Sequence, residues 1–175
     1  MNGSRPLRVA LLLGFGLVAV LAAMIPLGPG GHLVPPDLLF CLVLAWTLRA
    51  PGSVPIWALV LLGLFADTML SRPIGLGALG LLLAAEAVRG LMPRLRGLPF
   101  PAEWLVAVVL CALVLAGMHL ALRLVFADAP PAMDLVRYLV ATALAYPIVA
   151  AAVAIGLPGG LPGGLRSGLA RERAA

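Results

Sequence analysis

The chain has 175 residues, of which 63% are hydrophobic and only 11% are charged. A soluble domain of this length could not bury so much apolar surface, so the composition excludes a soluble protein and indicates an integral membrane protein. The formal net charge is +5, but all basic residues are arginines that flank apolar segments, which is typical of topology signals and not of nucleic-acid binding.

Six apolar stretches predict an all-α bundle of about six transmembrane helices, at residues 9–27, 37–48, 54–70, 74–92, 104–124 and 135–155. The first follows Arg5 and Arg8 as a secretory signal would, but its apolar run is longer than a signal requires, so we interpret it as a crossing. The second is short, and we expect it to be tilted, to thin the bilayer or to lie partly at the interface. In the sixth, Pro147 predicts a kink.

The six stretches leave no room for another folded domain. We expect residues 1–156 to form a single six-helix transmembrane domain. Residues 157–175 repeat Leu-Pro-Gly-Gly and end with three arginines, so they predict a flexible, basic cytoplasmic tail.

The placement of arginine predicts that both termini face the cytoplasm. With the N-terminus inside, nine arginines flank inner helix ends and three flank outer ends, which satisfies the positive-inside bias. The inner set is Arg5, Arg8, Arg49, Arg89, Arg94, Arg96, Arg166, Arg171 and Arg173, and the outer set is Arg72, Arg123 and Arg137. Positions near Gly30 and Asp128 should then face outward, and Gly97 and the tail after Leu165 should face inward.

A polar layer is expected in the outer half of the bundle. Asp67 stands near the outer end of the third stretch, where a carboxylate is either functional, part of a structural ion pair, or an interfacial side chain that reaches water. His119 and Arg123 share one face of the fifth stretch, and Arg137 opens the sixth. We expect Asp67 to pair with Arg123.

For His119, hydrogen-bonded packing is favoured over catalysis or metal binding, because no ligand set surrounds it. Further charges in this half are Arg72, Asp128 and Asp134.

Small residues at helical spacing predict close helix contacts. Gly63 lies one turn before Asp67 on the same face, and Gly14 and Gly16 could act similarly in the first stretch. The candidates for packing against a partner helix are Trp46, Gly63, Gly75, Gly77, Gly80 and Ala84. Glu86 and Arg89 are three residues apart and are expected to form a structural pair.

Catalytic motifs are not evident in the sequence. It has no Walker loop, no HExxH motif, no CxxC motif and no evident Ser/His/Asp set, so we expect neither an enzyme nor a cofactor or metal site. Cys41 and Cys111 lie within apolar stretches, where a free thiol behaves as a small hydrophobe, so no disulfide is expected.

An ordered series of short motifs resembles one membrane family. Its members in this sequence are Pro36-Asp37-Leu38-Leu39, Leu44-Ala45-Trp46-Thr47-Leu48, Pro51, Gly63-Leu64-Phe65-Ala66-Asp67 and Gly75. In their joint spacing, over residues 35–91, they resemble the rod-shape-determining protein MreD. Length, hydropathy and the number of crossings agree with that family over the whole chain.

The resemblance implies a place in the machinery that builds the side wall of rod-shaped bacteria, in the inner membrane. A member would lie beside the bitopic protein MreC, the glycosyltransferase RodA with its class B penicillin-binding transpeptidase, and MreB filaments. The family's helix arrangement has also been likened to the substrate-binding components of energy-coupling-factor transporters.

Two functions follow from these observations. The favoured hypothesis is a non-catalytic scaffold or regulator of the peptidoglycan elongation complex, which controls cell shape by presenting a packing surface to an MreC-like transmembrane helix. The alternative is a substrate-binding transmembrane subunit of a transporter for a vitamin or an ion. For that role the residues around Asp67, His119 and Arg123 would form a pocket.

Overall fold

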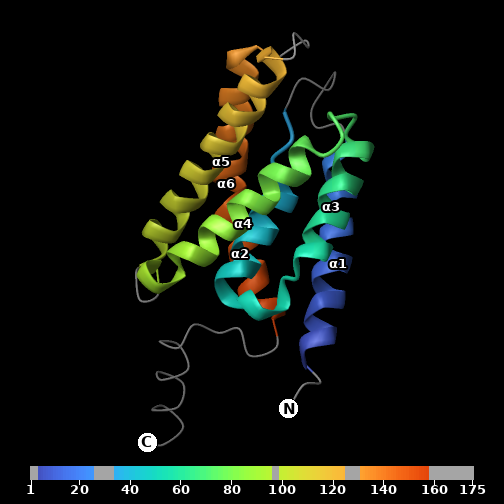
Figure 1. The fold of residues 1–175 in the computed structure, drawn as a ribbon. Coiled ribbons are helices and arrows are strands. Elements are labelled where there is room, and N and C mark those ends of the chain that lie inside the picture. The colour runs from blue at the N-terminus through green and yellow to red at the C-terminus, as the bar shows by residue number, and fades with distance from the viewer. Residues whose placement is uncertain (1–3, 26–33, 96–98, 125–130, 158–175) are drawn as a thin grey trace, which may run out of the picture.

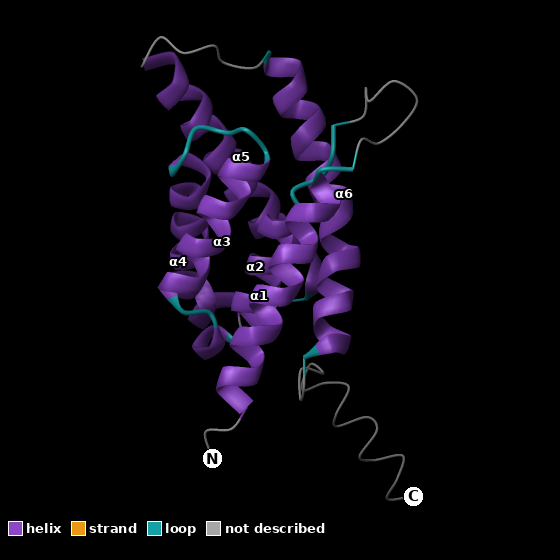
Figure 2. Cartoon of the chain, turned by 90° about the vertical axis from the view of Figure 1, so that its right-hand side faces the viewer, coloured by secondary structure: helices purple, strands orange, loops and turns teal. Residues whose placement is uncertain are grey.

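The computed structural model of the chain describes residues 4–25, 34–95, 99–124 and 131–157. These residues form six α-helices and one short 3-10 helix, and they contain no strand (Figures 1 and 2). The elements are α1 (Ser4–Ala23), α2 (Leu38–Arg49), η2 (Pro51–Ser53), α3 (Ile56–Met69), α4 (Leu76–Leu95), α5 (Phe100–Leu124) and α6 (Ala132–Gly156). The predicted all-α bundle of six helices is therefore confirmed. Gly30, Gly97, Asp128 and the expected tail, apart from Leu157, lie outside the described residues.

Four of the six helices, α1, α4, α5 and α6, are long and apolar enough to cross a membrane. The other two, α2 and α3, have 12 and 14 residues, which correspond to about 18 and 21 Å of helix. Both α5 and α6 begin a few residues earlier than predicted. Prolines are compatible with a helix start, so Pro101 lies in the first turn of α5 and Pro131 directly precedes α6.

The short helix α2 lies at the centre of the bundle. It packs against α1, α4 and α6 and, over a smaller area, against α5. Nine of its twelve residues, from Leu39 to Thr47, are buried. Because longer helices surround it, α2 need not span the hydrocarbon layer by itself. The structure therefore places α2 in the core of the bundle.

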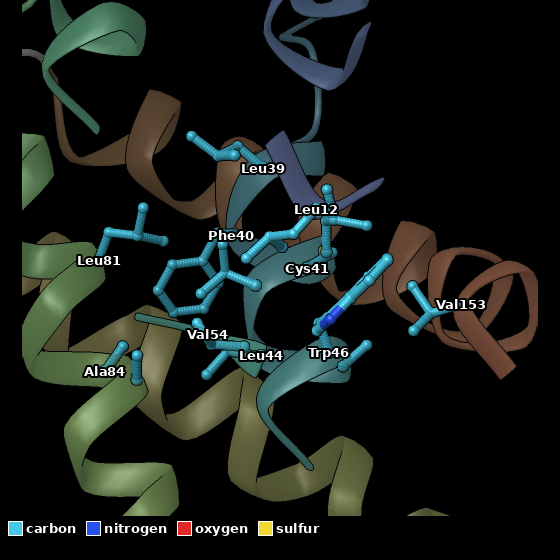
Figure 3. Packing of buried hydrophobic residues seen from close by; sticks show 14 of the residues in the cluster. Leu12, Leu39, Phe40, Cys41, Leu44, Trp46, Val54, Leu81, Ala84 and Val153 are labelled. Carbon is cyan, nitrogen blue, oxygen red and sulfur yellow. The ribbon is translucent and has the colours of Figure 1, made fainter. Parts of the chain in front are cut away.

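Trp46 joins α2 to two neighbouring elements. Its side chain is only 1% exposed, and its Nε1 donates a hydrogen bond to the hydroxyl of Ser53, in η2, at 3.2 Å. The ring of Phe15, from α1, lies 6.2 Å from the Trp46 ring between centroids. Buried apolar side chains from several helices fill the space around Trp46 (Figure 3). The tryptophan of the sequence motif is thus a core residue.

The helix ends gather at two poles of the bundle. The start of α1, the end of α2, the start of α5 and the end of α6 lie at one pole, which we call the Arg49 end (Figure 1). The end of α3, the start of α4, the end of α5 and the start of α6 lie at the opposite pole, the Asp67 end. Successive helices therefore alternate in direction.

Candidate functional site

Asp67 caps a neighbouring helix. It lies in the last turns of α3 and is 1% exposed. Its Oδ2 accepts hydrogen bonds from the backbone N–H groups of Gly75 at 2.9 Å and Ala78 at 3.2 Å, at the start of α4. The first N–H groups of a helix have no partner within that helix, and a negative charge there is favourable. The carboxylate therefore fixes the start of α4 against the end of α3.

Three glycines make this junction possible. A Cβ at Gly63 would lie 2.6 Å from the Cα of Ala78, so the absence of a side chain lets α3 and α4 approach closely. A Cβ at Gly77 would lie 2.1 Å from the Asp67 Oδ1. Gly75 has a φ of +90°, in the left-handed region that favours glycine. Gly63, Asp67 and Gly75 of the sequence motif, together with Gly77, thus build the junction between α3 and α4.

The remaining packing candidates also contact the chain itself. A Cβ at Gly80 would lie 2.6 Å from Val114 of α5, and Ala84 is 2% exposed. In α1, Gly16 packs against Leu62 of α3, whereas Gly14 faces open space. The small residues expected to receive a partner helix therefore contact other helices of this bundle. Gly75 is the exception, because it lies in the turn before α4.

A second polar cluster joins three segments at the Asp67 end. The Asp37 carboxylate caps α2 by accepting from the Phe40 N–H at 2.9 Å, and its Oδ2 lies 3.5 Å from Arg72 Nη1. Arg72 Nη2 donates to the Tyr138 hydroxyl at 2.8 Å, and this hydroxyl donates to Asp37 Oδ2. The Asp37 N–H donates to the Thr142 hydroxyl at 3.0 Å. The cluster ties the starts of α2 and α6 to the α3–α4 turn.

Arg72 stays charged in this cluster. Burial alone would lower the pKa of its guanidinium, but Tyr138 and Asp37 outweigh that effect, and the net shift of the pKa is upward. A permanently charged Arg72 therefore faces the Asp37 carboxylate across the working pH range.

The expected pair of Asp67 with Arg123 is not among the ion pairs of the described residues. Arg123 lies exposed in the last turn of α5. Arg137 is also exposed and pairs with Asp134 at 3.3 Å, one turn away on α6. Of the four residues predicted for the polar layer, the structure brings together only Asp67 and His119, which line the same cavity.

That cavity lies at the Asp67 end and has a volume of about 570 Å³. Residues from all six helices line it, and most of them are apolar. Its polar lining consists of Asp37, Asp67, Ser71, Arg72, His119, Asp134 and Tyr138. Two buried atoms of this lining, Asp67 Oδ1 and His119 Nδ1, have no hydrogen-bond partner among the described residues. The cavity is therefore a concave site in which polar groups from α3 and α5 lack partners among the described residues.

The Arg49 end has ion pairs of its own. Arg49 Nη1 lies 3.0 Å from Glu103 Oε1, which also accepts a hydrogen bond from the Tyr146 hydroxyl at 2.8 Å. The predicted pair of Glu86 with Arg89 is confirmed, and Arg89 donates in addition to the Val54 carbonyl. Arg49, Glu103 and Tyr146 hold α2, α5 and α6 together at this pole, and Arg89 ties α4 to the segment between η2 and α3. Cys41 and Cys111 are buried free thiols.

The sequence analysis missed Asp37 and Tyr138. The signal for Asp37 was present, because an aspartate directly before an apolar run is typical of a helix N-cap. Tyr138 gave no such signal, since its role depends on contacts with residues 66 and 101 positions away. Within the described residues, no group of three or more His, Cys, Asp or Glu side chains could hold a metal ion.

A comparison with protein-family models matches residues 4–153 to MreD, the rod shape-determining protein. The chain belongs to the MreD family. The match runs from the start of α1 into the last turn of α6, and the four long apolar helices agree with a multi-pass membrane protein of the MreD family. Membership supports a role in determining rod shape. Comparisons with curated proteins and with solved structures found no match.

Proposed function

We propose that this MreD-family protein is a non-catalytic scaffold of the peptidoglycan elongation machinery, with both termini in the cytoplasm, and that it binds the transmembrane helix of an MreC-like partner. The observation that carries the proposal is the family match over residues 4–153. The use of charged side chains for caps and ion pairs, as at Asp67 and Arg49, agrees with a structural role. RodA-type and class B penicillin-binding enzymes, and MreB filaments, would be reached directly or through that partner.

The partner helix is proposed to pack on α5. Only 11% of the α5 span is buried inside the bundle, against 39% of the α4 span, so α5 has the larger free surface. One stripe of exposed apolar side chains on α5 consists of Leu105, Val109, Leu113, Leu120 and Leu124. Gly117 lies within this stripe, and a Cβ there would meet no atom within 4 Å. Helices in lipid associate through close packing at small residues, so Gly117 gives a partner backbone room to approach.

Co-purification tests this surface. Gly117→Leu should lower recovery of an MreC-like protein about tenfold, equivalent to about 1.4 kcal/mol, and should round the cells, while the abundance of the variant stays normal. Gly14→Leu is the matched control, because Gly14 is also exposed and faces open space. Full partner recovery and rod shape with Gly117→Leu would exclude the α5 surface, and an absence of any MreC-like partner for the wild type would contradict the scaffold function.

The cavity favours a second candidate function, the substrate-binding subunit of a small-molecule transporter. Its volume of about 570 Å³ lies in the range of ligand pockets. This function predicts that an energy-coupling ATPase co-purifies with the wild-type protein. Recovery of an MreC-like protein without such an ATPase would favour the scaffold.

A further inference from the structure

We propose that the cavity at the Asp67 end binds a small amphiphile whose polar end donates hydrogen bonds, such as a primary ammonium or a hydroxyl group. Most residues of the cavity wall are apolar, and only a few polar side chains belong to it. A largely apolar pocket with a few polar groups is the usual form of a small-molecule site. The proposed site is separate from the α5 stripe, so its test is independent of the partner test.

The apolar part of the ligand would lie against α2, α4 and α5. Leu39 and Phe40 of α2 and Leu81 of α4 line the cavity, and all three are labelled in Figure 3. Leu115 and Met118 of α5 line it as well. An alkyl chain would replace weakly packed space with van der Waals contacts to these side chains.

The polar end of the ligand would contact Oδ1 of Asp67, which has no hydrogen-bond partner among the described residues. Asp67 is 1% exposed and lines the cavity, and its Oδ2 already accepts two backbone hydrogen bonds, while Oδ1 has no partner among the described residues. A buried polar atom without a partner is costly, and a carboxylate oxygen accepts hydrogen bonds. The group that satisfies Oδ1 must therefore be a donor.

His119 adds a second contact from another helix. It belongs to α5, and its buried Nδ1 also has no partner within the described residues. A neutral imidazole nitrogen either accepts or donates, depending on the tautomer. An ammonium or hydroxyl group that donates to Asp67 could therefore also contact His119.

The charge of the lining argues against an anionic ligand. The lining contains three carboxylates, Asp37, Asp67 and Asp134, and one guanidinium, Arg72. That guanidinium is already engaged by Asp37 and Tyr138. Asp134 is paired with Arg137, so Asp67 is the carboxylate of the lining that has no ion pair among the described residues. A phosphate or carboxylate would meet the Asp67 carboxylate in a site partly screened from water, where like charges repel more strongly than in bulk.

Three probes that differ only in the polar end test this inference. The full chain in phosphatidylcholine nanodiscs would be heated with octylamine, octanol or octanoate. We expect octylamine and octanol to raise the midpoint temperature in a saturable way, with an affinity for octylamine at least tenfold above that for octanoate. Equal shifts from octylamine and octanoate, or no saturable shift from octylamine, would overturn the proposal.

Three further variants separate binding in the cavity from partitioning into lipid. Leu115→Trp fills the cavity and should abolish the saturable shift, whereas Leu144→Trp, on the exposed face of α6, should leave it unchanged. In Asp67→Asn the amide oxygen must still cap α4, which places an NH₂ donor at the Oδ1 position. The octylamine affinity should then fall at least tenfold. Unchanged affinity in Leu115→Trp or in Asp67→Asn would overturn the site.

The ligand can come from two sources. If nanodiscs that contain phosphatidylethanolamine weaken the octylamine shift, the ammonium headgroup of the lipid competes for the cavity, and the native ligand is a lipid. If the shift is unchanged, the native ligand is a free amphiphile. Either result supports the site and assigns its source.

Discussion

The two oxygens of the Asp67 carboxylate have different surroundings. Oδ2 accepts from two backbone N–H groups of α4, whereas Oδ1 lies beside the Cα of Gly77 and has no partner among the described residues. The side chain can therefore hold the helix start with one atom and offer the other to a ligand.

Gly77 is predicted to be intolerant of even one methyl group. In Gly77→Ala the new Cβ would lie 2.1 Å from Oδ1, so the carboxylate must move and its cap to α4 is lost. We expect a loss of about 1–3 kcal/mol in the free energy of unfolding. On the same helix, Gly90→Ala adds a methyl group in open space and should be neutral or stabilising by up to about 1 kcal/mol. Unfolding midpoints of the two variants provide the comparison, and equal midpoints would contradict the cap.

Asp37, and not Asp67, is predicted to be coupled to an arginine. In a double-mutant cycle, Asp37→Asn and Arg72→Gln should show a coupling of about 0.5–3 kcal/mol, because these groups form an ion pair and share the Tyr138 hydroxyl. The cycle of Asp67→Asn with Arg123→Gln should be additive, since Asp67 is bound by backbone N–H groups. A coupling of similar size in the second cycle would restore the pairing that the sequence favoured.

At the scale of the elements, the α3–α4 contact determines how the glycine motif responds to mutation. Gly63→Leu places a large side chain where even a Cβ would lie 2.6 Å from the backbone of Ala78, so the helices must separate. Overpacking of this kind costs about 1–3 kcal/mol or more. We therefore expect Gly63→Leu to reduce the amount of folded protein in membranes as well as partner recovery, while Gly14→Leu leaves both unchanged. Normal abundance of Gly63→Leu in size-exclusion profiles would contradict the internal contact.

The elements themselves were predictable because six apolar stretches separated by Pro, Gly and charged residues leave little freedom in a bilayer. The short second stretch was also evident from Asp37 and Arg49 at its flanks. Its central position was not, because a hydrophobic helix has the same composition whether it faces lipid or other helices. For the same reason the sequence could not tell that Gly63, Gly77 and Gly80 face the chain itself.

The candidate site was predictable only in part. Asp67 and His119 were recognised because polar groups are costly inside apolar stretches. The predicted pairing of Asp67 with Arg123 is not found among the described residues, because the spacing of residues along a helix shows which of them share a face of that helix. It does not show how far two helices lie apart. The actual contacts of Asp67 and Asp37 are set by the turn between α3 and α4 and by the position of α6.

At the scale of the whole molecule, the two poles of the bundle are predicted to face opposite sides of the membrane. Ser71 at the Asp67 end and Gly52 at the Arg49 end are exposed, and the native thiols are buried. In intact spheroplasts, Ser71→Cys should react with an impermeant maleimide, and Gly52→Cys should react only after permeabilisation. The wild-type protein, whose two thiols are buried, is the negative control for maleimide labelling. The reverse pattern would invert the topology.

The central position of α2 has a consequence for how the protein enters the membrane. A helix of 12 residues, about 18 Å long, cannot span about 30 Å of hydrocarbon, so the translocon has no complete stop-transfer segment to recognise when α2 emerges. Its final depth must be fixed later, once α4 and α6 have been synthesised and close around it. Reporter fusions to chains truncated after Arg49 should therefore give mixed topologies, whereas the same reporter inserted into the full-length chain should give one.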